Sequence, residues 1–260
     1  MSQELLVLAV APGIVLMVFF YSLDRFEPEP RDKILKTMGL GAVAVVPAVI
    51  LELLGQAVLV PAGADSQNTA ELAVYAFVVV AFSEEIVKLW AVWVYIYRDP
   101  EFDEPYDGVV YCVAASLGFA IVENVKYVAD YGAGTGVLRA LLAVPAHSLF
   151  GVAMGYFVGR ARFARNEGTE LRLNLIGLSM AVVMHGTYDF LLFHGTSEAL
   201  LLVFPLVALF WAVGLWQVKK GVDLSPFRPG ARFSFCPRCG QGAAEGRRFC
   251  HRCGCDLSTG

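Results

Sequence analysis

The stretch Ser83-Glu84-Glu85-Ile86-Val87-Lys88 decides how the chain is interpreted, because it places three charged side chains inside an apolar run from about Ala70 to Tyr97. On insertion scales a charge at the centre of a bilayer costs roughly 2.5–3.5 kcal/mol, so it persists where it meets a partner or serves a function. Glu84 and Lys88 are four residues apart and share one face of a helix, where they can form an ion pair. The stretch therefore predicts a membrane helix that carries a functional polar site.

The composition is that of a membrane protein. Of the 260 residues, 57% are hydrophobic and 17% are charged, and the mean hydropathy is +0.59, whereas soluble domains carry about 25% charged residues. Seven apolar runs are each near or above the roughly 20 residues that a helix needs to cross a bilayer, and no alternating ten-residue segments indicate a barrel. We therefore expect an all-α membrane protein with about seven transmembrane helices. The runs are about 4–21, 34–60, 70–97, 108–128, 137–159, 173–193 and 199–218.

The distribution of basic residues predicts the orientation in the membrane. Lys and Arg lie in the first, third and fifth connecting segments and after the last run, whereas the second and sixth connections contain none. Because basic loops face the cytoplasm, we expect a multi-pass protein of the plasma membrane with its N-terminus outside and its C-terminus in the cytoplasm. Pro47 is expected to kink the second helix, and residues 130–136 are expected to form a glycine-rich turn. The net charge of −4 argues against a nucleic-acid partner.

Further polar side chains lie inside the later helices. Glu123 is in the fourth run, His147 is in the fifth, and His185 and Asp189 share a face of the sixth. A single membrane histidine is often a hydrogen-bonded packing residue, and a single glutamate can be a structural ion-pair partner. A set of carboxylates and histidines from four helices is instead typical of a functional site.

The spacing of small residues predicts which way the two histidines point. Gly151, Gly155 and Gly159 follow His147 at four-residue steps, and Gly177 and Ala181 precede His185 at the same step. Such stripes mark helix–helix interfaces in membranes. Both histidines are therefore expected to face protein. Glu52 and Gln56 are also four residues apart, and we interpret them as a structural pair.

Two chemistries fit this set of side chains. Histidines and carboxylates suit Zn²⁺, with ligands from His147, His185 and either Asp189 or Glu123. Glu84 or Glu85 would then accept a proton from the metal-bound water. In a metal-free version, a glutamate and a histidine activate water while other groups stabilise the oxyanion. An ionised Asp189 cannot donate a hydrogen bond to an oxyanion, which favours the metal.

At these residues the chain resembles the PrsW family of intramembrane proteases and, more distantly, the CAAX prenyl protease and bacteriocin-processing clan. The resemblance covers about residues 5–218, and the wider clan often has Asn where this chain has Asp189. It implies hydrolysis of membrane-anchored proteins, and an anti-sigma-factor-like substrate by analogy with the family's namesake. The motifs are Glu84-Glu85-x-x-Lys88, Phe119-Ala120-x-x-Glu123-Asn124, His147 and His185-x-x-x-Asp189. The resemblance also implies an active site formed by Glu84, Glu85, Glu123, His147 and His185.

The C-terminal segment has the pattern of a separate small module. A linker at 221–234 joins the membrane domain, residues 1–220, to a segment at 235–260 that contains two C-x-x-C pairs. Four cysteines in this arrangement predict a structural zinc ribbon, since so short a segment needs a metal to fold. We expect the module to recruit a cytoplasmic protein partner. The expected zinc ligands are Cys236, Cys239, Cys250 and Cys253.

The sequence thus predicts an intramembrane endopeptidase in the lipid bilayer, with zinc in the ribbon and in the membrane site. The alternative is a transporter or channel for protons or divalent metal ions, because buried Glu, His and Asp side chains serve ion pathways as well. Transporters are often built from inverted repeats with broken helices. The sequence shows no clear internal repeat, which favours the protease.

Overall fold

The computed structural model describes residues 1–63, 68–229, 236, 250 and 255. Over these residues the chain forms helices and no β-strand, which confirms the predicted all-α class. In chain order the described elements are α1 (Gln3–Ser22), α2 (Arg31–Val43), α3 (Val45–Leu59), α4 (Thr69–Val74), the π-helix η1 (Tyr75–Ala81), α5 (Phe82–Tyr95), α6 (Pro105–Leu141), α7 (Ala143–Arg162), α8 (Glu167–His194) and α9 (Ser197–Asp223).

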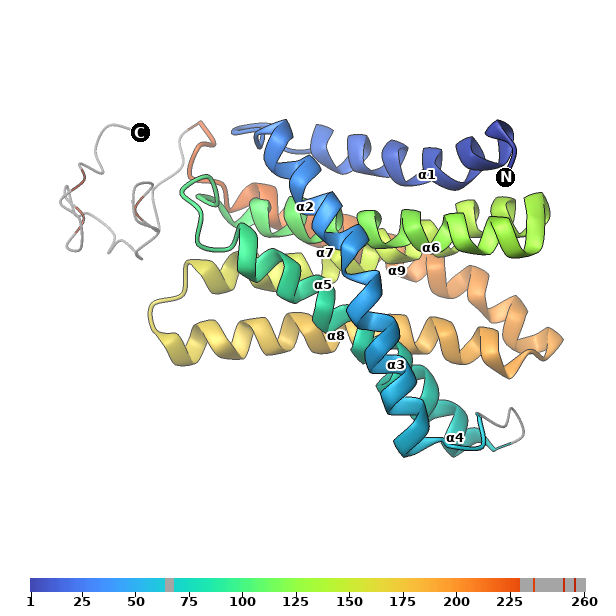
Figure 1. Ribbon diagram of the computed structural model, residues 1–260. Coiled ribbons are helices and arrows are strands. Elements are labelled where there is room, and N and C mark those ends of the chain that lie inside the picture. The colour runs from blue at the N-terminus through green and yellow to red at the C-terminus, as the bar shows by residue number, and fades with distance from the viewer. Residues whose placement is uncertain (64–67, 230–235, 237–249, 251–254, 256–260) are drawn as a thin grey trace.

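The centre of the fold is the antiparallel pair of α6 and α7. Helix α7 lies between α6 and α8, α1 and α2 lie against α6, and α9 packs against α7 and α8 (Figure 1). The first half of α6 and nearly all of α7 are buried on every side. A helix that is apolar all round is stable only when other helices or lipid surround it. The other helices therefore enclose a dry centre.

Glycines allow α6, α7 and α8 to approach closely. A side chain on Gly155 or Gly159 of α7 would overlap the backbone of α6, and a Cβ on Gly151 would lie 2.9 Å from the carbonyl oxygen of Cys112. A Cβ on Gly177 of α8 would lie 2.8 Å from the carbonyl oxygen of Met154. The prediction that these glycines mark helix–helix interfaces is confirmed.

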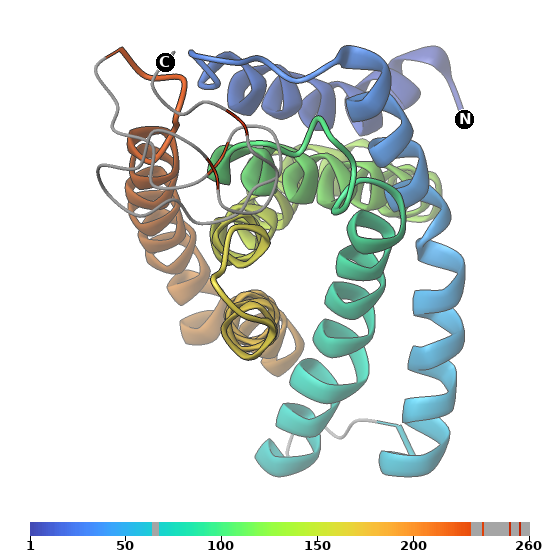
Figure 2. The same cartoon turned by 90° about the vertical axis from the view of Figure 1, so that its left-hand side faces the viewer.

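Helices α3, α4, η1 and α5 form an arm that diverges from the bundle (Figure 2). Helix α3 runs beside η1 and α5. The break between α2 and α3 falls at Ala44, close to Pro47, whose missing N–H cannot bond to the carbonyl of Val43. The predicted kink is confirmed.

The chain reverses direction at Gly132, inside the glycine-rich turn that the sequence predicted. Segment 130–136 lies within the bounds of α6, but Gly132 has non-helical backbone angles, with φ at 80°, and joins two helical parts. The second part runs back along the first, since a Cβ on Gly136 would lie 2.9 Å from the Val128 side chain and Arg139 forms an ion pair with Glu123. It ends at Leu141, and α7 follows from Ala143. The predicted turn at 130–136 is therefore confirmed.

Five described segments are long and apolar enough to cross a membrane. They correspond to six of the seven predicted runs, because the segment of 58 residues includes both α6 and α7 and so contains two of those runs. The third predicted run is absent from the five because it is divided among α4, η1 and α5. The candidate spans are Gln3–Ser22, Arg31–Leu59, Pro105–Arg162, Glu167–His194 and Ser197–Asp223.

Candidate active site

A π-helix leads directly into the Glu-Glu pair. Residues Tyr75–Ala81 adopt π geometry, and Glu84 and Glu85 lie in the first turn of the α-helix that follows. Single π-turns are rare and often occur at functional sites. The wider turn rotates α5 relative to α4, so that Glu84, Glu85 and Lys88 are all 5% exposed or less. The expectation that this stretch is buried among partners is confirmed.

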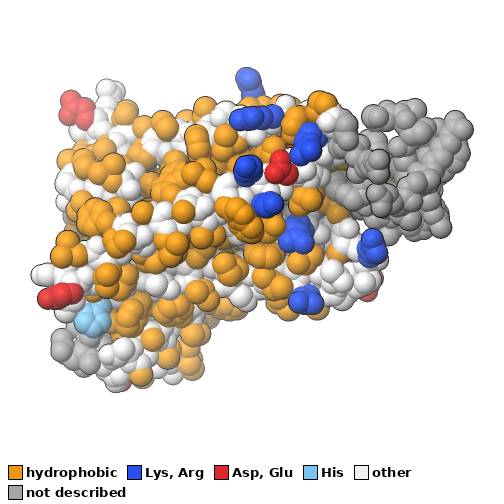
Figure 3. Space-filling model, turned by 180° about the vertical axis from the view of Figure 1, so that it is seen from behind, with side chains coloured by type: hydrophobic (Ala, Val, Ile, Leu, Met, Phe, Trp, Pro, Cys, Tyr) orange, Lys and Arg blue, Asp and Glu red, His pale blue; other side chains and the backbone are white. Residues whose placement is uncertain are grey.

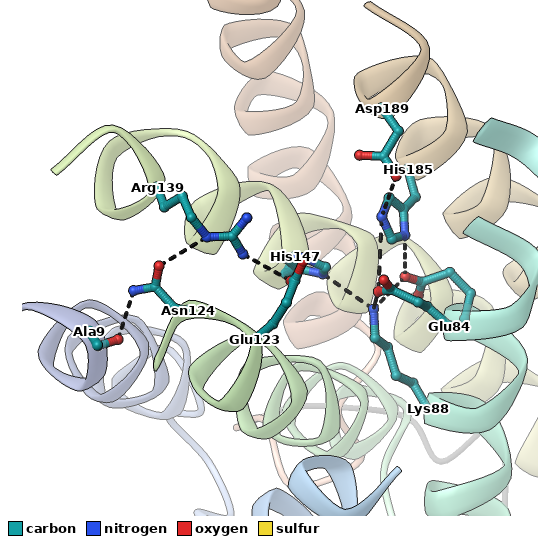
Figure 4. Close-up of polar contacts among 10 residues, drawn as sticks. Ala9, Glu84, Lys88, Glu123, Asn124, Arg139, His147, His185 and Asp189 are labelled. Carbon is teal, nitrogen blue, oxygen red and sulfur yellow. Dashed lines mark hydrogen bonds and ion pairs between the residues drawn. The ribbon is translucent and has the colours of Figure 1, made fainter. Parts of the chain in front are cut away.

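Lys88 is the centre of the polar network (Figure 4). Its Nζ donates to Oε2 of Glu84 at 2.9 Å and to Oε1 of Glu85 at 2.8 Å, and it lies 3.2 Å from Nδ1 of His147. The ammonium also lies 4.2 Å from the centroid of the Phe119 ring, within cation–π range. The predicted pair between Glu84 and Lys88 is confirmed, and Lys88 also links α5 to α7.

His185 connects α8 to the Glu-Glu pair. Its Nδ1 lies 2.9 Å from Oε1 of Glu85, and its Nε2 lies 3.2 Å from Oδ2 of Asp189. The ring stacks on Phe150, with centroids 4.8 Å apart and planes 18° apart. Contacts on both edges and one face fix the orientation of the imidazole. As predicted, Asp189 shares a helix face with His185, and the histidine faces protein.

His147 is held from behind by α6. Its Nε2 lies 3.0 Å from Oε2 of Glu123, and the same carboxylate oxygen lies 2.9 Å from Arg139. The Glu123 carboxylate therefore accepts contacts from both α6 and α7. The imidazole rings of His147 and His185 meet edge to face, with centroids 5.1 Å apart. Four helices thus converge on one buried place, as the sequence predicted.

Sequence reasoning missed Arg139. This residue lies 16 positions after Glu123, a spacing that carries no motif. The reversal at Gly132 brings the second part of α6 back beside the first, which places Arg139 next to Glu123. The Nε of Arg139 also donates to Asn124 at 3.0 Å, and Asn124 in turn donates to the Ala9 carbonyl at 2.8 Å (Figure 4). The network therefore extends from the histidines to α1.

Glu52 also lies nearer to the site than the sequence suggested. It was interpreted as a structural partner of Gln56, but no hydrogen bond joins the two described side chains. Instead Glu52, on α3, is close enough to interact electrostatically with Glu123, His185 and Lys88. Glu52 is a charged residue inside an apolar run, as Glu84 is. The same argument that drew attention to Glu84 could therefore have placed Glu52 near the site.

The side chains fit a divalent metal ion. Glu84, Glu85, His147 and His185 each place one ligand atom within 4.8 Å of the others. Outer carboxylates commonly hold the second nitrogen of a metal-binding histidine, and Glu123 and Asp189 contact the two Nε2 atoms in this way. The Nδ1 of His147 thus points toward Lys88, and that of His185 points toward Glu85. Glu123 and Asp189, which the sequence offered as alternative metal ligands, lie on the opposite edges of the two rings.

Comparison with known proteins identifies the family. The protein-family model described as "PrsW family intramembrane metalloprotease" matches residues 29–215 of the sequence, a range that includes Glu84, Glu85, Lys88, Glu123, His147, His185 and Asp189. The chain belongs to this family. The Protease PrsW of Geobacillus kaustophilus is 38% identical over 213 residues, which are 81% of this chain and 89% of that protein. The Protease PrsW of Bacillus subtilis is 34% identical over 81% of this chain and 92% of its own length. No solved structure matches the chain significantly.

Family membership confirms the resemblance found in the motifs. Proteins of this family are described as intramembrane metalloproteases, and the chain has five candidate membrane spans. It is therefore an integral membrane protein of a protease family. The transporter alternative finds no support in these relatives.

The C-terminal cysteines lie largely beyond the described residues. Cys239 and Cys253 fall outside them, and so does most of the segment between. Cys236 and Cys250 are described and buried, and the N–H of Cys250 donates to the carbonyl of Cys255 at 2.8 Å. The zinc ribbon stays a prediction.

Proposed function

We propose that this protein is an intramembrane endopeptidase that hydrolyses membrane-anchored proteins with a water molecule activated by Glu84. The observation that carries the proposal is the buried network in which Lys88 joins Glu84, Glu85 and His147 at 2.8–3.2 Å. Charged groups in so apolar a bundle need a functional reason. The protease relatives supply the reaction class.

Glu84 is better placed than Glu85 to act as the general base. The side chain of Glu85 is fully buried, and its Oε1 contacts both Lys88 and His185. The side chain of Glu84 retains 7% exposure, and its Oε2 contacts Lys88. A general base must reach the water from which it takes a proton. We infer that Glu84 takes this proton and passes it to the leaving amine, while Glu85 positions Lys88 and His185.

His147, His185 and a carboxylate of the pair would hold the proposed catalytic zinc. When bound, such an ion lowers the pKa of water and polarises the scissile carbonyl. The chain supplies the orientation: Glu123 fixes the ring of His147, and Asp189 fixes that of His185. Lys88 offers a positive charge to the oxyanion that forms during hydrolysis.

The proposed topology has seven crossings, with the N-terminus outside the cell and the C-terminus in the cytoplasm. In this topology α4, η1 and α5 together form the third crossing. On the face drawn in Figure 3, Lys and Arg side chains gather toward one end of the molecule. Basic residues also lie in the last turns of α7 and α9, namely Arg160, Arg162 and Lys220. The positive-inside rule supports this orientation in the plasma membrane.

The proposed C-terminal module is a zinc ribbon that recruits a cytoplasmic protein. Its support is the spacing of Cys236, Cys239, Cys250 and Cys253, which is typical of a four-thiolate site. Zinc content measured on the full chain and on a chain that ends at Val222 tests both proposed zinc sites. Two zinc ions in the full chain and one in the shorter chain would support both. Zinc in the full chain alone would contradict a zinc ion in the membrane site.

The proposed substrate is a single-span membrane protein, of the anti-sigma-factor type by analogy with the family's namesake. The test is a census of new protein N-termini in membranes from cells that produce the wild-type chain, Glu84→Gln or Glu198→Gln. Glu198 is exposed at the start of α9 and serves as the matched control. We expect N-termini within or beside membrane spans in the wild type and the control, and their loss in Glu84→Gln. The same N-termini in all three samples would overturn the proposal.

A further inference from the structure

A second group of buried carboxylates lies away from the active site, at the end of the bundle where α1 and α9 end and α6 begins. Asp24 follows α1, Glu104 immediately precedes α6, and Asp107 lies in the first turn of α6. Their exposed fractions are 5%, 1% and 0%. Each places one carboxylate oxygen within 4.8 Å of the other two. Figure 2 views the molecule toward this end.

These carboxylates lack the partners that buried anions need. Neither oxygen of Asp24 meets a donor in hydrogen-bonding geometry, although backbone N–H groups of Glu27 and Glu29 lie nearby. Oε2 of Glu104 and Oδ1 of Asp107 also have no hydrogen-bond partner. The ion pairs formed by the described residues include none of Asp24, Glu104 and Asp107. Buried polar atoms are nearly always satisfied, so four unsatisfied oxygens in one place indicate a missing positive partner.

Helix capping explains only part of this cluster. Oδ2 of Asp107 accepts the N–H groups of Asp103 and Glu104 at 2.8 Å each, which satisfies the start of α6. That role leaves Oδ1 of Asp107 unused, and it gives no role to Asp24. Burial raises the pKa of Asp24 to about 7 and that of Glu104 to about 8. Their ionised forms are therefore unfavourable unless a cation compensates them.

We propose that Asp24, Glu104 and Asp107 bind a hard divalent cation, Ca²⁺ in preference to Mg²⁺. All donors are oxygens, which hard cations prefer. One oxygen from each of the three carboxylates lies close enough to the others to reach a single ion. Ca²⁺ accepts oxygen ligands in flexible geometry, whereas Mg²⁺ demands a near-ideal octahedron and gives up its water reluctantly, so buried carboxylates from separate positions suit Ca²⁺ better. Glu29, whose Oε1 is also unsatisfied and whose Oε2 accepts from Tyr111, lies beside the site.

The cation would join two segments that are distant in sequence. Asp24 belongs to the connection between α1 and α2, and Glu104 and Asp107 lie at the start of α6. Ser225, which follows α9 and is 3% exposed, contacts Glu104, so the site also lies beside the end of α9. Its role is to hold this end together, and it is separate from hydrolysis.

Tb³⁺ luminescence on the full-length protein in detergent tests the proposal. Tb³⁺ replaces Ca²⁺ at oxygen sites and emits when nearby tyrosines are excited, and Tyr106 lies beside Asp24 and Glu104. We expect saturable emission that Ca²⁺ displaces at a lower concentration than Mg²⁺. Asp24→Asn and Glu104→Gln should each weaken Tb³⁺ binding at least tenfold. Asp32→Asn, at an exposed position, is the matched control and should leave binding unchanged.

Several outcomes would overturn the proposal. Emission that is unchanged in Asp24→Asn and Glu104→Gln, or that is lost in Glu84→Gln, would place the ion elsewhere. An absence of saturable emission would remove the site, and better displacement by Mg²⁺ would refute the preference for Ca²⁺. If the variants fail to fold, thermal unfolding of the wild-type protein tests the proposal instead. Ca²⁺ should raise the midpoint of unfolding, and an unchanged midpoint would refute the proposal.

Discussion

Replacement of Lys88 with methionine tests whether the ammonium neutralises the Glu-Glu pair. The Lys88 side chain is 1% exposed, and its partners Glu84 and Glu85 are 7% and 0% exposed, so the contacts at 2.9 and 2.8 Å are shielded from water. Removal of one member of a buried ion pair costs about 3–5 kcal/mol, because the other charge stays buried without compensation. Since Lys88→Met leaves two carboxylates, we expect a loss at the upper end of that range. SDS unfolding in mixed micelles, followed by the circular dichroism of the helices, measures it.

Two further variants make this test specific. Lys126→Met makes the same substitution in an exposed pair with Asp130, and we expect an unchanged unfolding midpoint because exposed pairs contribute little. The double variant Lys88→Met/Glu85→Gln should regain part of the lost stability, since it removes one of the two uncompensated charges. If Lys88→Met unfolds at the same SDS fraction as the wild type, Lys88 does not neutralise the pair and the reasoning is refuted.

Three other predictions concern separate parts of the molecule. Asp189→Asn should lower the affinity of the membrane site for metal about 10–100-fold, because it removes the carboxylate that orients a ligand; competition with a chelator measures this, and unchanged affinity would contradict it. Gly155→Val should destabilise the fold by about 1–3 kcal/mol or more, because its side chain would overlap the backbone of Gly108, whereas Gly39→Ala, in open space, should not. Burial alone would raise the pKa of Asp99, but the hydrogen bond from Lys33 on α2 lowers this pKa below the ordinary value of 3.8. This pair therefore stabilises the fold above pH 3.8 and loses its effect as the pH falls further, and Asp99→Asn should flatten acid unfolding curves in that range.

The polar stretch at 83–88 could be interpreted from the sequence because its charged residues differ from the apolar residues directly around them. Charges in an apolar run, and partners four residues apart, depend only on helix geometry. For the same reason the pairs of Glu84 with Lys88 and of His185 with Asp189 were predictable. The glycine stripe on α7 was predictable too, since close packing requires small residues wherever the partner helix lies.

The reversal at Gly132 was predictable from sequence as well. Segment 130–136 contains several glycines, and local rules favour a turn there. The contacts that follow the turn were not predictable: Gly136 packs against Leu8 and Val128, and Arg139 reaches back to Glu123. These contacts depend on how the two parts of α6 lie against each other and against α1, so no local signal indicates them.

The sequence by itself determined the helical class, the membrane setting, the family and the residue types of the site, because each of these follows from composition, period or motif. Only the tertiary structure decided which partner each of those residues contacts. It places Lys88 between α5 and α7, sets Glu123 and Asp189 behind the histidines, and brings Asp24 to the start of α6. These are contacts between residues far apart in the chain, and their geometry depends on how the helices cross, which the order of residues along each helix does not specify.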